Sequence, residues 1–214
     1  MKTLLDLVLP ARCGGCARPG TGWCGECAAE LARGPVRVRP RTDPGVPCWA
    51  VGPYAGPAGR AVVAAKEHGR RDLAGPLGLA MATVLAGLRA LDRPLVLVPA
   101  PTRAVAARRR GGDPVARAAG VAAGWLIDCR TVTLLRMGRG VRDSVGLRTH
   151  ERAHNLRGRI MVIRHGADMA GIPANAEVVL VDDVLTTGAT AAESVRVLSR
   201  IGARPRAVLV TCAA

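Results

Sequence analysis

The sequence predicts an α/β protein in which helices flank a parallel β-sheet and a small cysteine-rich module precedes them. Short, continuous apolar runs at residues 95–98, 178–182 and 207–211 are typical of strands buried on both faces. Helical patterns alternate with these runs, as they do in parallel sheets with helices on both faces. Four of the seven cysteines lie in the first 34 residues, which indicates a separate module.

The remaining elements follow from periodicity and from glycine and proline positions. Residues 1–34 form the expected cysteine module, residues 35–57 are rich in Pro, Gly and Arg and predict a linker or arm, and residues 58–214 form the main domain. Helices are expected at residues 60–66, 73–91, 115–127 and 191–201, with a short one at 151–155. Further strands are expected at 131–135 and 160–163. Gly202 is well placed to end the last long helix.

The charge balance leaves two interpretations open. The formal net charge of +15 and a pI near 11.2 favour a polyanionic partner such as nucleic acid. Nearly all of this charge is arginine in a chain rich in Ala, Gly and Pro, so a coding bias explains it equally well. With three Trp, one Tyr and no Phe, the chain offers few aromatic rings on which single-stranded bases could stack.

The first ten residues carry a lysine followed by a short apolar stretch that Asp6 interrupts. This stretch is too short for a membrane span, and we interpret it as a short helix or strand rather than a secretion signal. The expectation is a cytoplasmic protein without membrane insertion.

Residues 178–190, Val-Val-Leu-Val-Asp-Asp-Val-Leu-Thr-Thr-Gly-Ala-Thr, carry the clearest chemical pattern. An apolar strand delivers the adjacent acids Asp182 and Asp183, a small turn rich in hydroxyl groups follows, and a helix then begins. Free backbone N–H groups at a helix start form a phosphate cradle, and Gly188 allows the anion a close approach. Phosphate beside carboxylates suits a ribose 5-phosphate, whose hydroxyls the acids would bind.

A structural explanation of the same residues is a helix capped by Asp183 or Thr186, with the rest as turn chemistry. Two adjacent acids at the end of a buried strand are costly without a ligand or cation, which favours the ligand site.

Cys13, Cys16, Cys24 and Cys27 form two Cys-x-x-Cys pairs separated by seven residues. Four thiolates at this spacing can hold one tetrahedral zinc with no open position, which predicts a structural metal. A redox pair or an iron–sulfur cluster is the alternative.

Residues 178–190 resemble the thirteen-residue signature by which type I phosphoribosyltransferases bind 5-phosphoribosyl-1-pyrophosphate (PRPP). Together with the cysteine pairs, and with similarities at residues 66–73, 97–101, 108–111 and 152–156, the chain resembles the ComF family of phosphoribosyltransferase-like proteins. The resemblance implies a type I phosphoribosyltransferase-like sheet and a bound magnesium ion. It also implies ribose binding by Asp182 and Asp183, and 5-phosphate binding by Thr186, Thr187, Gly188, Ala189 and Thr190.

By the same resemblance, a pyrophosphate loop would comprise Ala100, Pro101, Thr102 and Arg103, with Lys66 adding charge unless it is a solvated lysine at a helix end. Residues 108–110 would contact phosphate or nucleic acid, or form a solvated basic face. Residues 136–148 would close over the substrate, or form an ordinary loop.

Two departures limit what the resemblance implies about the acceptor. Thr186 stands where purine-salvage enzymes carry an aspartate that handles a proton on the base, and Gly112-Asp113-Pro114 replaces the usual Phe-Asn-Gln. A glutamine common in the later loop is not evident near residues 143–146. Three functions therefore remain: a PRPP-dependent transferase, a non-catalytic accessory protein of DNA uptake and competence, and a zinc-dependent binder of nucleic acid such as single-stranded DNA. A homodimer is compatible with each.

Overall fold

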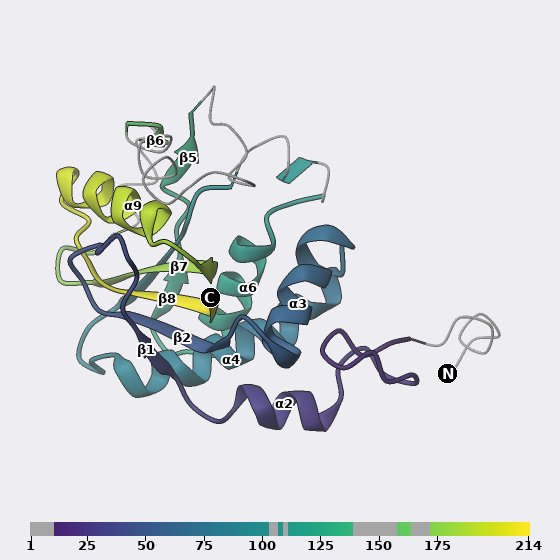
Figure 1. Ribbon diagram of the computed structural model, residues 1–214. Helices are drawn as coiled ribbons and strands as arrows, with labels where there is room; N and C mark the ends of the chain where they lie inside the picture. Colours follow the sequence, from purple (N-terminus) through teal and green to yellow (C-terminus); the bar gives the residue numbers. More distant parts are fainter. Residues whose placement is uncertain (1–10, 103–106, 109–110, 139–157, 164–171) are drawn as a thin grey trace.

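The computed structural model describes residues 11–102, 107–108, 111–138, 158–163 and 172–214 (Figure 1). A six-stranded sheet has the order β1-β2-β8-β7-β3-β4, in which only the β1–β2 pair is antiparallel. Its strands are β1 (Val36–Val38), β2 (Cys48–Pro53), β3 (Leu95–Pro99), β4 (Cys129–Thr131), β7 (Glu177–Leu185) and β8 (Pro205–Ala213). The strands β5 (Leu135–Met137) and β6 (Ile160–Val162) form a separate antiparallel pair.

Helices cover both faces of the sheet, as the sequence predicts (Figure 1). The helices are α2 (Gly25–Leu31), α3 (Gly56–Glu67), α4 (Ala74–Leu88), α6 (Pro114–Gly124) and α9 (Ala189–Arg200), with a 3-10 turn η1 (Arg71–Leu73) before α4. One apolar core lies between the sheet and α3, α4 and α6, and a second lies between the sheet and α9. The predicted mixed α/β fold with a mostly parallel sheet is confirmed.

Local chemistry explains where two of the helices begin and end. Asp113 caps α6, because its carboxylate accepts hydrogen bonds from the backbone N–H groups of Val115 (2.8 Å) and Ala116 (3.4 Å). Gly202, with a φ of +84°, follows the end of α9, as predicted for a helix stop.

The expected linker, residues 35–57, contains strands of the main sheet. β2 pairs in parallel with β8 along its length, and β1 pairs with β2. Between β1 and β2 the chain runs to the carboxyl end of β7. There the Thr42 N–H donates to the carbonyl of Thr187 at 2.8 Å. These pairings could not be predicted, because the proline, glycine and arginine of this segment obscure the pattern of a short strand. The division into three domains stays a prediction.

The cysteine module packs against α3 and η1. The Arg60 guanidinium donates to the carbonyl of Gly15, and that of Arg70 donates to the carbonyls of Arg12 (2.9 Å) and Gly22 (3.2 Å). Gly14 lies so close to Leu73 that an added Cβ would stand 2.5 Å from its side chain. These contacts fix the module to the main domain.

Within the described residues, no helix is both long enough and apolar enough to cross a bilayer. The expected features at residues 1–10 and 151–155, and most of the predicted closing loop at 136–148, lie outside the described residues.

Candidate functional site

The strand order changes direction between β3 and β7. From β3 the chain continues outward to β4, whereas from β7 it continues in the opposite direction to β8. In open parallel sheets such a switch point leaves a crevice outside the strand ends, where ligands bind. The loops that leave β3 and β7 contain two of the predicted site segments, residues 100–103 and 186–190.

Asp182 and Asp183 lie within β7 rather than after it. The sequence predicts a strand that stops at Asp182, but pairing with β8 continues to Leu185 and Ala213. Successive side chains of a strand point to opposite faces. Asp183 lies on the side of α3, the side of Val181, where it pairs with Lys66, and alternation from Leu180 places Asp182 on the opposite face.

Lys66 of α3 pairs with Asp183. Its ammonium group lies 2.8 Å from each carboxylate oxygen, and the two side chains are 33% and 13% exposed. The Cys212 thiol, on the adjacent strand β8, donates to the backbone carbonyl of Asp183 at 3.5 Å. The structure places Lys66 beside Asp183, and its expected contribution to pyrophosphate binding stays a prediction.

Asp182 has a different environment. Its Oδ1 accepts a hydrogen bond from the Asp183 N–H at 2.8 Å. The side chain keeps some exposed area but is closely surrounded by protein atoms. Desolvation first, and the neighbouring charge of Asp183 second, raise the pKa of Asp182 to about 8, against the opposing effect of Lys66. An acid pair with one lysine counter-charge is a hard-oxygen donor set suited to a cation or to ribose hydroxyls.

The turn after β7 is built around Gly188. This residue is the N-cap of α9 and has a φ of +85°. As a glycine it has no side chain with which to cap the helix. The predicted alternative, a cap from Asp183 or Thr186, is therefore not observed. Thr186 is exposed, and the Thr187 hydroxyl accepts from the Ala189 N–H at 3.4 Å. The first N–H groups of α9 have no partner within the helix, and their predicted role in binding a phosphate stays a prediction.

Pro40 and Thr42, in the segment between β1 and β2, pack against this turn. An added Cβ on Gly188 would lie 2.3 Å from the carbonyl oxygen of Thr42 and 2.7 Å from Cβ of Pro40. Pro40 and Thr42 could not be predicted as neighbours of this turn, because a contact between residues so far apart in the chain leaves no local pattern.

The loop after β3 lies beside the acid pair. Pro99 is in register with Val181, and the Ala100 N–H donates to the Val181 carbonyl at 2.8 Å. Ala100 is therefore next to Asp182 across the crevice. Pro101 is buried and Thr102 is half-buried, while Arg103 lies outside the described residues. The structure thus brings the two predicted loops together at the carboxyl ends of two central strands.

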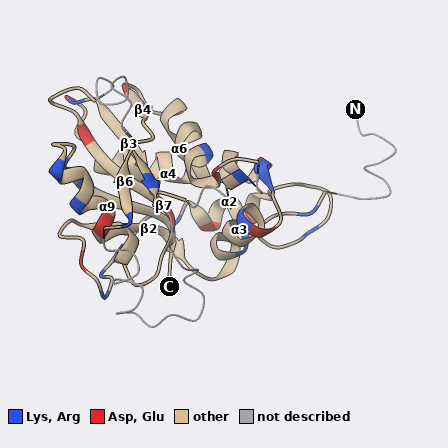
Figure 2. Cartoon of the chain, turned by 90° about the horizontal axis from the view of Figure 1, so that it is seen from above, with Lys and Arg blue, Asp and Glu red and all other residues tan. Residues whose placement is uncertain are grey.

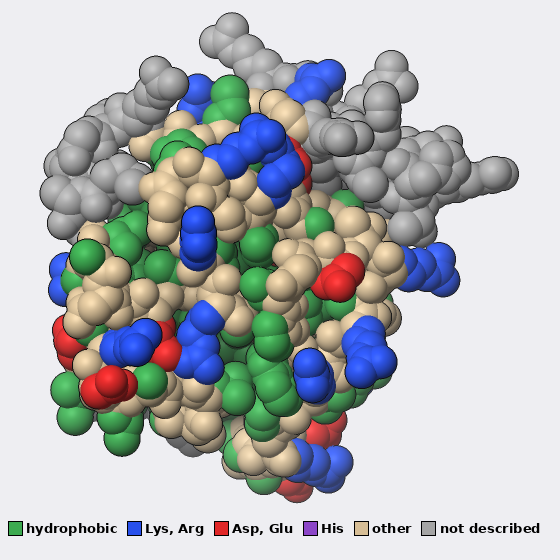
Figure 3. Space-filling view, turned by 90° about the vertical axis from the view of Figure 1, so that its left-hand side faces the viewer, with side chains coloured by type: hydrophobic (Ala, Val, Ile, Leu, Met, Phe, Trp, Pro, Cys, Tyr) green, Lys and Arg blue, Asp and Glu red, His purple; other side chains and the backbone are tan. Residues whose placement is uncertain are grey.

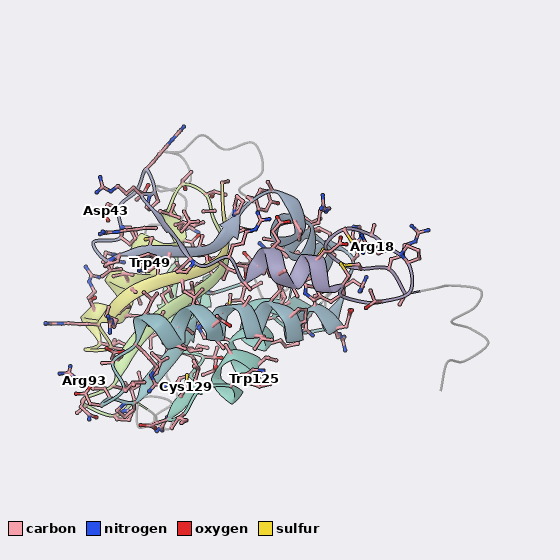
Figure 4. All side chains as sticks on the ribbon, turned by 90° about the horizontal axis from the view of Figure 1, so that it is seen from below. Arg18, Asp43, Trp49, Arg93, Trp125 and Cys129 are labelled. Carbon is pink, nitrogen blue, oxygen red and sulfur yellow. The ribbon has the colours of Figure 1, made fainter. Side chains whose placement is uncertain are left out.

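The four predicted cysteines form a compact cluster at the module. Their sulfur atoms all lie within 4.8 Å of one another, with 3.7 Å between Cys13 and Cys27 and 3.6 Å between Cys16 and Cys24. Four sulfurs at about 2.3 Å from a tetrahedral zinc stand about 3.8 Å apart, so the spacing fits such an ion. The cluster could hold a metal, as the sequence predicts. In Figure 4, Arg18 of the same module points away from the main domain, where it pairs with Glu26 at 2.7 Å.

Comparisons with known proteins gave matches only among solved structures. A scan against protein-family models and a search of curated proteins each found no match. The solved structures include a Trypanosoma cruzi hypoxanthine phosphoribosyl transferase (TM-score 0.36, 16% identity, 68% of this chain and 64% of that chain). Another is a mutant of the same kind of enzyme from that organism, with ternary substrates (TM-score 0.35, 17% identity, 68% and 66%). The chain thus spans slightly less than two thirds of the length of these structures.

Proposed function

We propose that the crevice between β3 and β7 binds PRPP, or another ribose 5-phosphate, and that the chain is a phosphoribosyltransferase-like protein of the ComF type. One observation carries the proposal. The strand–acid pair–glycine turn–helix unit of residues 178–190 stands at the switch point of the sheet, with the residues 100–102 loop beside it. The start of α9, which would bind phosphate, and the two carboxylates then lie together at the carboxyl end of β7.

Each group has a separate task in this proposal. The N-terminus of α9, with Gly188, would bind the 5-phosphate, and Asp182 and Asp183 would bind the ribose hydroxyls from the two sides of β7. The loop from Ala100 would face the pyrophosphate. Magnesium would be held through the pyrophosphate and the ribose hydroxyls beside the acids, and it would neutralise charge that develops on the leaving pyrophosphate.

In phosphoribosyl transfer the bond between the anomeric carbon and the pyrophosphate oxygen breaks, and the ribose gains oxocarbenium character. A carboxylate beside the ribose stabilises that positive charge only when it is ionised. Lys66 pairs with Asp183 and would balance the charge of that carboxylate, whereas burial raises the pKa of Asp182 to about 8. Thr186 is exposed at the position where purine-salvage enzymes carry an aspartate, so we propose no purine-base chemistry.

Calorimetry with PRPP and magnesium tests this proposal. We expect saturable binding that Asp182→Asn and Asp183→Asn each weaken at least tenfold, while Asp92→Asn, an exposed acid on the connection between α4 and β3, leaves it unchanged. Absence of binding, or equal binding by all four proteins, would exclude the ribose site. A pyrophosphate-release assay across a panel of acceptors then separates a transferase from a binding protein.

The second candidate is a role in DNA uptake or another nucleic-acid process in the cytoplasm, supported by the net charge of +15. Figure 2 shows Lys and Arg distributed over the module, α9 and the loops rather than collected on one element. Phosphate neutralisation releases counterions, so specific electrostatic binding of single-stranded DNA must weaken steeply with salt. A flat salt dependence would remove this candidate.

A further inference from the structure

A second cavity lies at the amino end of the sheet, on the edge opposite Asp182 and Asp183. It is bounded by the first residues of β2, β3, β7 and β8, and by the last turn of α4, and its volume is about 210 Å³. Figure 3 looks onto this side of the molecule and shows hydrophobic side chains in a hollow that Lys and Arg surround. We call this cavity the amino-edge pocket.

The interior of the amino-edge pocket is apolar. Trp49 of β2 provides a flat indole wall, and Figure 4 shows Trp49 beside the end of α4. Leu85 and Leu88 of α4 face it, and Leu95 and Leu209 of the sheet add to the lining. Trp49 and Leu88 are half-buried and offer apolar surface against which a flat apolar group could be buried.

The rim of the pocket is cationic. Arg37, Arg89 and Arg206 line it, together with a single carboxylate, that of Glu177. Glu177 is 8% exposed and is already engaged, since it pairs with Arg206 and accepts from the Ala90 N–H at 3.1 Å. Three guanidinium groups and one carboxylate therefore give the lining of the pocket a formal charge of +2.

The remaining arginines differ in their partners. Arg89 donates to the carbonyls of Ile127 and Arg93, the second at 3.1 Å, which fixes its position, and among the described residues it has no ion pair with a carboxylate. Arg37 is exposed and lies between the pocket and a more open hollow of about 580 Å³ that also shares Pro47. A ligand can therefore enter past Arg37.

We propose that the amino-edge pocket binds a small anion with a flat apolar body, of the class of aromatic carboxylates. Its volume of about 210 Å³ exceeds the roughly 150 Å³ in which an apolar cavity holds benzene, so one or two fused rings fit. The ring lies between Trp49 and the leucines of α4, and the carboxylate faces Arg37 and Arg89. This site is independent of the ribose site, from which the length of β7 separates it.

Calorimetry with 2-naphthoate tests the proposal, with the neutral 2-naphthamide as a matched probe. We expect saturable 1:1 binding of the acid and at least tenfold weaker binding of the amide. Arg37→Gln, an exposed substitution that keeps the fold, should weaken the acid about tenfold. Leu88→Trp, which fills the apolar interior, should weaken both probes. Arg200→Gln, at the end of α9 and away from the pocket, is the charge-matched control and should change nothing.

Several results would overturn the proposal. These are absence of saturable binding at millimolar 2-naphthoate, equal affinity for acid and amide, or equal losses from Arg37→Gln and Arg200→Gln. Displacement of 2-naphthoate by PRPP would also overturn it, because the probe would then occupy the crevice at the opposite edge. If Leu88→Trp does not fold, the Arg37→Gln and Arg200→Gln comparison alone decides.

Discussion

Gly188→Ala is the substitution whose effect the structure defines most directly. At a φ of +85° an alanine pays about 1–2 kcal/mol for the left-handed conformation. Its Cβ would also stand 2.3 Å from the Thr42 carbonyl oxygen, so the arm or the turn must move by roughly 1 Å. Such a movement strains the Thr42–Thr187 hydrogen bond, whose loss costs about 0.5–1.5 kcal/mol. We expect a total destabilisation of about 1.5–3.5 kcal/mol.

Gly202→Ala provides the matched control at the other end of the same helix. Gly202 has a φ of +84°, and no atom lies within 4 Å of an added Cβ, so only the conformational cost remains, about 1–2 kcal/mol. In a domain of this size 1 kcal/mol lowers the melting temperature by about 2–4 °C. Thermal unfolding of the two variants therefore separates the contact with the arm from the backbone strain.

The same pair of variants tests the phosphate cradle. A displacement of the turn by about 1 Å should weaken PRPP at least tenfold in Gly188→Ala, while Gly202→Ala binds like the wild type. Equal melting temperatures for the two variants would refute the close contact with Thr42. A loss of stability in Gly188→Ala without any loss of PRPP affinity would refute the placement of the phosphate at this turn.

Three further predictions concern the acids and the cysteines. Lys66→Met leaves the Asp183 carboxylate without its 2.8 Å partner, and we expect about 1–3 kcal/mol of destabilisation by urea unfolding at pH 7, while Lys66→Arg retains most of the stability. The pKa of Asp182 is raised to about 8 when folded, above the value of about 3.9 in an unfolded chain. The folded state therefore holds an extra proton between these values, and the stability that this proton contributes is lost as the pH rises toward 8. Asp182→Asn should accordingly gain stability relative to wild type from pH 5 to pH 8, and a constant difference in urea unfolding would contradict this assignment. Metal analysis should find one zinc per chain, lost in Cys27→Ser but kept in Cys129→Ser, and chelation should lower the melting temperature of the zinc-containing proteins.

Buried apolar runs and the acid–glycine turn made the sheet predictable, whereas the contacts that position the site were not. The runs around Leu97 and Leu180 are strands because only a sheet covered on both faces buries such segments completely. Pro40, Thr42 and Lys66 approach residues 182–188 across more than 100 positions of sequence. Such pairings depend on how β2 and α3 pack, and they leave no periodic pattern.

The position of the two acids shows how the length of a strand changes a functional interpretation, since β7 continues to Leu185 rather than ending at Asp182. Had β7 stopped at Asp182, Asp183 would belong to a loop and both carboxylates could turn to the same ligand atom. Pairing with β8 at Asp182 and again at Val184 and Leu185 keeps both acids within the strand, and the alternation shifts only after Asp183, since Val184 packs on the side of Val181 and Leu185 on that of Leu180. One acid then stands over α3, where Lys66 balances its charge, and the other stands where burial opposes ionisation. Adjacent identical residues thus acquire different surroundings from strand geometry, and a ribose bound beside them would meet one acid paired with a lysine and one whose pKa burial raises to about 8.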